Sequence, residues 1–123
     1  MAAFSENELK RQLLDFLKEF KELMGQGRYI VKGHYKNIQT LKDLGITARL
    51  RDELILSIAL QDYSSGPISD ELNPGHFWVF GKELDKTEIY IKLKIVTYST
   101  RNEKAICISF HPSERPMKYP FRR

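Results

Sequence analysis

The chain has 123 residues, of which 41% are hydrophobic and 29% are charged, and this length suits a single domain, residues 1–123, that buries about two-thirds of its unfolded surface. A lone cysteine, Cys107, excludes an internal disulfide, and no apolar stretch approaches the ~20 residues of a membrane helix. The residues Ser5–Glu8 are polar, whereas a signal peptide would have an apolar segment at this position. We therefore expect a cytoplasmic protein with no membrane partner.

The net charge of +4 is unevenly distributed along the chain. Residues 1–75 hold ten Lys or Arg against eleven Asp or Glu, whereas residues 76–123 hold ten against five. A basic second part indicates a polyanionic partner such as RNA. A lysine-rich surface kept for solubility explains the same excess equally well.

Three helices are predicted in the first half of the chain, at residues 5–25, 34–45 and 47–60, with a short extended piece at 29–32. Ser5 followed by Glu8 is a capping-box pattern, and apolar residues then recur at helical spacing. Gly45 is typical of the residue that ends a helix, and Thr47 is typical of the residue that begins one.

From residue 76 onward the hydrophobic pattern changes to the period of two that is typical of strands. Before it, residues 64–75 hold two glycines and two prolines without periodicity, and we predict a loop there. After it, the tail at 112–123 carries three prolines and four basic residues and is predicted to cross the surface. We therefore expect an α+β protein, with N-terminal helices packed on one face of a small C-terminal antiparallel sheet. The predicted strands are Phe77–Leu84, Glu88–Tyr98 and Lys104–His111.

Side chains alternate across a strand, so each predicted strand has one apolar and one polar face. The residues expected to face the helices are Ile89, Ile91, Leu93 and Ile95 in the middle strand and Ile106, Ile108 and Phe110 in the last. Solvent is expected to cover the opposite face, so that replacing Lys94 by alanine should cost little stability. If Tyr98 pairs with Glu103 in the hairpin, the cross-strand pairs on this opposite face are Tyr90 with His111, Lys92 with Ser109 and Lys94 with Cys107.

One face of the predicted sheet thus gathers an imidazole, a phenol and ammonium groups. Metal-free cleavage of RNA by its own 2′-hydroxyl needs a base, an acid and positive charge on the phosphorane, and it leaves 2′,3′-cyclic phosphate and 5′-hydroxyl ends. Histidine titrates closest to neutral pH, so His111 is the first candidate for proton transfer, with Tyr90 and Lys92 beside it. The candidates for binding RNA phosphates are Lys82, Lys94, Arg115 and Lys118.

A plainer role exists for each of these residues. A lone histidine at the end of a strand is more often a surface residue than a catalyst, and lysines on a half-buried sheet are more often simply solvated. Trp78–Phe80 are expected in the core rather than under a nucleobase, and Cys107 as an inert buried thiol. No metal or other cofactor is expected, because the three histidines and Cys107 lack ligand spacing and no glycine-rich phosphate loop occurs.

Four short motifs stand in the order that they have in a known family. They are Asp62-Tyr63 with Gly66-Pro67, WVFGK at Trp78–Lys82, YIKLK at Tyr90–Lys94 and CISFHP at Cys107–Pro112. Through them, residues 35–121 resemble the MqsR family of toxins from bacterial type II toxin-antitoxin operons. The resemblance implies a RelE-like fold and endonuclease action on mRNA, free or on the ribosome. It also implies a partner antitoxin, of helix-turn-helix type, that neutralises the toxin and binds operator DNA.

The family's site residues carry over only in part. Its sheet tyrosine matches Tyr90, and its C-terminal catalytic lysine aligns with His111, a different kind of acid or base. Its glutamine falls near Val79, so that role is vacant or passes to Lys82, and its loop lysine falls near Ser65. The helix within residues 1–26 is an addition to the family's usual start.

Two other classes of function fit the same sequence. A non-catalytic RNA- or ribosome-binding module would use the same basic face. A protein-interaction domain would dock a partner on an exposed sheet edge or on the first helix, with the charge asymmetry incidental. Loss of viable cells on induced expression, rescued by His111→Ala, would favour the enzyme over both.

Overall fold

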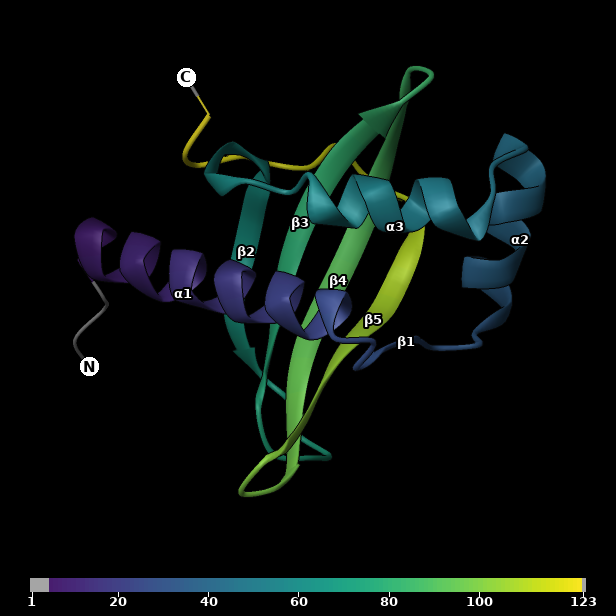
Figure 1. Cartoon of the computed structure of the whole chain (residues 1–123). Coiled ribbons are helices and arrows are strands. Elements are labelled where there is room, and N and C mark those ends of the chain that lie inside the picture. The colour runs from purple at the N-terminus through teal and green to yellow at the C-terminus, as the bar shows by residue number, and fades with distance from the viewer. Residues whose placement is uncertain (1–4, 123) are drawn as a thin grey trace.

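Three helices pack against a five-stranded mixed sheet in the computed structural model, which describes residues 5–122 (Figure 1). Helices α1 and α3 cover one face of the sheet, and α2 lies beside its β5–β1 edge (Figure 1). The opposite face is crossed by the C-terminal segment, drawn in yellow. The elements are α1 (Glu6–Gly25), β1 (Tyr29–Val31), α2 (Tyr35–Leu44), α3 (Ala48–Leu56), a 3₁₀ turn (Leu60–Asp62), β2 (Tyr63–Ser69), β3 (His76–Leu84), β4 (Thr87–Ser99) and β5 (Asn102–Pro112).

The helix boundaries follow the predicted capping chemistry. The Ser5 hydroxyl accepts a hydrogen bond from the Glu8 N–H at 3.1 Å, and the Thr47 hydroxyl accepts one from the Leu50 N–H at 3.1 Å. Gly45 ends α2 in the left-handed conformation, with φ of 65°. The predicted helices are confirmed, except that α3 ends at Leu56 rather than near residue 60. No helix in the described part of the chain, residues 5–122, is both long and apolar enough to cross a membrane.

The sheet has the strand order β1-β5-β4-β3-β2, and the prediction that it is purely antiparallel is wrong. The three predicted strands form the antiparallel centre, but β1 pairs with β5 in parallel. The predicted loop is also wrong over its first half, because Tyr63–Ser69 form the edge strand β2. Gly66 and Pro67 are typical of loops and led to this prediction. Proline is nevertheless tolerated in an edge strand, and the pairing of β2 with β3 is irregular around these two residues.

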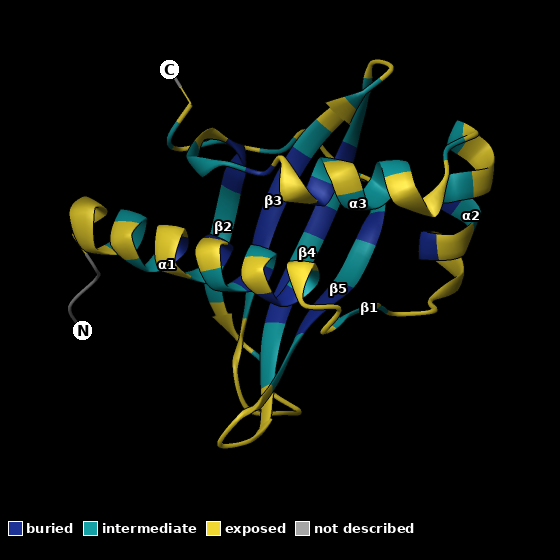
Figure 2. Ribbon diagram, in the orientation of Figure 1, coloured by how far each residue is buried: buried dark blue, intermediate teal, exposed yellow. Residues whose placement is uncertain are grey.

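The core lies between α1, α3 and the covered face of the sheet. Its fully buried side chains include Leu13, Phe20, Ile55, Phe80, Ile91, Leu93 and Phe110. Figure 2 shows this burial as dark blue bands across the middle of the strands, while the outward surface of α1 is exposed. The predicted apolar face of the middle strand is confirmed, since Ile89, Ile91 and Leu93 are completely buried in this core.

A bulge in β5 changes the predicted faces of that strand. Lys92 pairs with Ser109, but Leu93 pairs with Cys107, so Ile108 is an additional residue in the ladder. The predicted pairing of Lys94 with Cys107 is therefore wrong, as Lys94 lies opposite Ile106. Likewise, Cys107 rather than Ile106 belongs to the core on the helix side.

Asn37 of α2 satisfies the backbone groups that this bulge leaves free. Its side-chain amide donates to the carbonyl oxygens of Ile108 at 2.9 Å and Lys32 at 3.0 Å, and its oxygen accepts from the Phe110 N–H at 2.9 Å. The buried Asn37 side chain thus fixes α2 against β5 immediately before His111.

Candidate active site

The sheet face opposite α1 and α3, which we call the open face, presents one residue from each of three strands in a row. Gly81 of β3 pairs with Tyr90 of β4, which pairs with His111 of β5. The predicted pairing of Tyr90 with His111 is confirmed. Their rings stack, with centroids 5.3 Å apart and planes 18° from parallel. A phenol and an imidazole are therefore held together by strand register rather than by a mobile loop.

A groove of about 680 Å³ lies over this pair. Its floor comes from the sheet, and its far wall is the segment Ser113–Tyr119, which we call the strap. The groove is lined on the sheet by Ser64, Ser65, Val79, Tyr90 and His111, and on the strap by residues 113–118. Arg115 and Lys118, two of the predicted phosphate-binding residues, are exposed on the strap at this groove.

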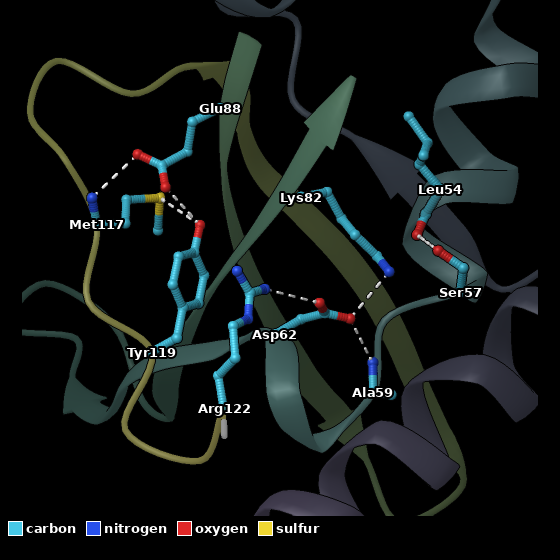
Figure 3. Close-up of polar contacts among 9 residues, drawn as sticks. All are labelled: Leu54, Ser57, Ala59, Asp62, Lys82, Glu88, Met117, Tyr119 and Arg122. Carbon is cyan, nitrogen blue, oxygen red and sulfur yellow. Dashed lines mark hydrogen bonds and ion pairs between the residues drawn. The ribbon is translucent and has the colours of Figure 1, made fainter. Parts of the chain in front are cut away.

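Glu88 at the start of β4 holds the strap in place (Figure 3). Its carboxylate accepts hydrogen bonds from the Ser113 hydroxyl at 2.9 Å, the Met117 N–H at 3.0 Å and the Tyr119 hydroxyl at 2.7 Å. Partial burial of this carboxylate opposes its ionisation, but the three hydrogen bonds outweigh that effect and hold its pKa below the usual value. One ionised side chain thus fixes both ends of the strap.

The strap also needs a glycine beneath it. A Cβ atom at Gly81 would overlap the Tyr119 hydroxyl and approach its ring carbon Cζ to 2.8 Å. Beyond the strap, Arg122 stacks on Tyr119, with its guanidinium 3.8 Å from the ring centroid, and it donates to Asp62 at 3.4 Å (Figure 3). The absence of a side chain at position 81 lets the tail cross the sheet at close range.

The hydrogen bonding of His111 defines which of its nitrogens can accept a proton. Nδ1 lies 3.0 Å from the carbonyl oxygen of Pro112. A carbonyl oxygen only accepts, so Nδ1 carries the hydrogen and, in the neutral ring, Nε2 is the basic nitrogen. Burial raises the pKa of the neighbouring Tyr90, whose phenol therefore keeps its proton at neutral pH. The pair thus combines a base and a protonated hydroxyl.

The five lysines and arginines of the predicted site do not all reach this groove. Lys92 is half-buried on the open face beside Val79, with its Nζ 4.0 Å from the Phe77 ring centroid. Lys82 lies on the helix side of the sheet instead, where it forms an ion pair of 2.9 Å with the buried Asp62. Of the predicted site residues, Tyr90, His111, Arg115 and Lys118 line the groove, and Lys92 lies next to it.

Lys94 is on the open face but is not available to solvent. Only 3% of the residue is exposed, and its ammonium group forms an ion pair of 2.6 Å with Asp70. This ion pair is the main reason that the pKa of Asp70 is lowered. The predicted exposure of Lys94 is therefore wrong, since the loop before β3 folds back and supplies a carboxylate to it.

Sequence reasoning missed the residues that shape the groove rather than carry its chemistry. Glu88 is the clearest case, although it stands two residues before Tyr90 and so belongs to the same face of β4. The sequence predicts Ser64 and Ser65 in a loop and Val79 in the core, yet all three line the groove, where Val79 is buried. No sequence signal points to the strap contacts of Met117.

Neither the cysteine thiol nor a cluster of metal-binding side chains adds to this site. Cys107 is completely buried, and burial is the main cause that raises the pKa of its thiol to about 12, so its reactivity is low, as predicted. Among residues 5–122 there is no group of three or more His, Cys, Asp or Glu side chains arranged to hold a metal ion.

Comparisons of the chain with the models of known protein families, with curated proteins and with solved structures found no match.

Proposed function

We propose that this chain is an endoribonuclease, the toxin of a type II toxin-antitoxin pair, that cleaves mRNA without a metal ion. The observation that carries the proposal is the stacked pair of Tyr90 and His111 at the base of a groove whose outer wall bears Arg115 and Lys118. The motifs shared with the MqsR family support the toxin assignment and, with it, a RelE-like fold and neutralisation by an antitoxin protein.

In the proposed reaction the substrate supplies its own nucleophile. His111 Nε2 takes the proton of a ribose 2′-hydroxyl, and the resulting 2′-oxygen attacks the adjacent phosphorus. The phosphorane carries additional negative charge, which Arg115 and Lys118 stabilise from the strap and Lys92 from the sheet. The bond between phosphorus and the 5′-oxygen then breaks, and the leaving oxygen takes the Tyr90 proton. The products are a 2′,3′-cyclic phosphate and a free 5′-hydroxyl.

The proposal is tested by the ends of the products. Purified protein is incubated with single-stranded RNA in the presence of EDTA, and the cleavage products are mapped and their termini identified. We expect cyclic phosphate and 5′-hydroxyl ends at an undiminished rate, and no cleavage where the scissile ribose lacks its 2′-hydroxyl. Cleavage at a 2′-deoxyribose, or loss of activity with EDTA, would contradict this mechanism.

The same incubation, with binding of the RNA measured alongside its cleavage, separates the two alternative functions from the enzyme and from each other. A non-catalytic RNA- or ribosome-binding module would bind the RNA through the same groove and leave it intact. A protein-interaction domain would bind it no better than a protein of similar charge does.

A further inference from the structure

A second groove, of about 220 Å³, lies between α2 and the end of β5. Its walls include Tyr35, Lys36, Gln39 and Asp43 from α2, and His111 from the sheet. His111 lines this groove and the larger one alike, so this residue stands where the two grooves meet. Beside it, Lys36 of the second groove forms an ion pair of 2.9 Å with Glu114 of the first.

Tyr35 is placed in this groove in a way that packing does not explain. It is 77% exposed, although a tyrosine normally buries much of its ring. The backbone that carries it is nevertheless held in place, because Asn37, two residues later, ties α2 to β5 through two hydrogen bonds. An aromatic ring that is open to solvent, on a helix whose position is fixed, suits a planar ligand.

The polar side chains of the groove can contact the edge of such a ligand. The Gln39 amide donates to the Asp43 carboxylate at 2.8 Å, and the two groups together offer both donors and acceptors beside Tyr35. Aromatic stacking combined with hydrogen bonding to base edges is how proteins recognise unpaired bases of RNA. A lipid chain would leave these hydrogen-bonding groups without partners.

We propose that the groove of α2 is a base-binding subsite, in which Tyr35 stacks on the nucleobase next to the scissile phosphate while Gln39 and Asp43 contact its edge. This inference rests on the proposed function, since it places that neighbouring nucleotide relative to His111. The RNA strand then runs from the strap groove, past His111, to α2, and Tyr35 is a residue that determines specificity.

The probe for this subsite is single-stranded RNA of mixed sequence with 2′-O-methyl riboses, which cannot be cleaved, and with 2-aminopurine placed at successive positions. Stacking of 2-aminopurine on a tyrosine quenches its fluorescence. For the wild-type chain we expect binding and quenching at one position in particular. Tyr35→Ala should weaken binding about tenfold, in keeping with the contribution of one stacked base, and should abolish the quenching. Tyr35→Phe should keep both.

The matched control is Tyr98→Ala, because Tyr98 is also an exposed tyrosine, at 58%, but lies near the β4–β5 hairpin. It should bind as the wild type does. If the wild-type chain binds the probe while Tyr35→Ala binds equally well with unchanged quenching, the subsite is refuted and the proposed function stands. If the wild-type chain binds no RNA at all, the proposed function fails and the subsite fails with it.

Discussion

The two faces of the sheet are formed by alternate residues of the same strands, yet different interactions hold the segments that cover them. The covered face is packed with aliphatic and aromatic side chains from α1, α3 and the strands, and it excludes water. The open face carries Tyr90, Lys92 and His111, and its cover is the strap, which polar contacts to Glu88 hold in place. The comparison indicates that stability resides mainly on one face and that the proposed chemistry resides on the other.

The largest stability effect should come from the covered face. Replacing Leu93, which is completely buried, by alanine should lower the free energy of unfolding by about 2–5 kcal/mol through loss of buried apolar surface and formation of a cavity. Lys92→Ala, one residue earlier and on the other face, should cost far less. Chemical denaturation measures both, and equal shifts of the two midpoints would contradict the division between the faces.

Lys94 sharpens this first prediction, because it lies on the open face but is buried. Lys94→Ala removes the partner of Asp70 and should therefore destabilise the fold more than Lys92→Ala does. Leu93→Ala should remain the most damaging of the three variants.

On the open face, His111→Ala should reduce the rate of single-turnover RNA cleavage by about 10² or more, the scale of a lost general base. The free energy of unfolding and the affinity for RNA should change little, because His111 is only half-buried and phosphate binding falls to the basic residues. Circular dichroism verifies that the variant is folded. Full activity of His111→Ala would contradict the residue assignment and leave Tyr90 as the next candidate.

The strap should have a smaller effect, and one that depends on salt. Glu88→Ala removes its three anchoring hydrogen bonds, so Arg115 and Lys118 should no longer be held over the groove. We expect weaker RNA binding, and a slope of log affinity against log salt that is flatter by about 1 to 2, since each lost phosphate contact contributes about one unit. The double variant Arg115→Gln, Lys118→Gln should give the same slope.

The control for the strap is Glu83→Ala. Glu83 is exposed and lies directly across from Glu88 on β3, so its removal changes the charge by the same amount. Loss of a negative charge alone should strengthen RNA binding slightly. Weakened binding in Glu83→Ala, or an unchanged slope in Glu88→Ala, would show that the strap does not position phosphate-binding residues.

The smallest effect concerns the rim of the covered face, where Glu19 of α1 meets Glu103 of β5. A hydrogen bond with Glu103 and partial burial raise the pKa of Glu19 to about 7. Because the folded pKa is higher than the unfolded one, the stability that Glu19 contributes is present below about pH 4.5 and is lost as the pH rises through 7. Glu19→Gln should therefore be more stable than the wild type at pH 8, by about 1 kcal/mol or less because the rim is solvent-screened.

Thermal denaturation at pH 5 and pH 8 measures this difference. Asp15→Asn is the control, as Asp15 is exposed on the same helix. A wild-type chain whose stability relative to Glu19→Gln is the same at both pH values would rule out the raised pKa.

Local chemistry made part of the fold predictable. The caps at Ser5, Gly45 and Thr47 depend on neighbouring residues alone. The predicted hairpin register of Tyr98 with Glu103 is wrong, since Glu103 pairs with Thr97, and Tyr90 lies opposite His111 because the bulge in β5 shifts the register back by one residue. The period of two applied to β3 places Lys82 on the side of Phe80, so its absence from the open face could have been predicted as well.

The errors arose where distant residues decide the outcome. The burial of Lys94 depends on Asp70, which lies 24 residues away in the chain, and the bulge in β5 depends on Asn37, which lies 73 residues from Phe110. The glycine and proline of edge strand β2 are typical of a loop. This segment is a strand because it pairs with β3, and such a pairing cannot be read from the composition of the segment itself. The strap likewise requires contacts between the tail and Glu88 that no periodicity describes.

The bulge at Ile108 has a consequence for how chains of this kind can change in evolution. Removing Ile108 would give β5 a regular alternation, with Cys107 and Phe110 still in the core and Ser109 and His111 still on the open face. Loss or gain of this one residue therefore leaves the other side chains of β5 on their present faces of the sheet. An insertion elsewhere in the strand would move the side chains that follow it to the opposite face. A regular ladder would deprive the buried Asn37 amide of its two partners in β5, so Ile108 and Asn37 should be inherited or lost together.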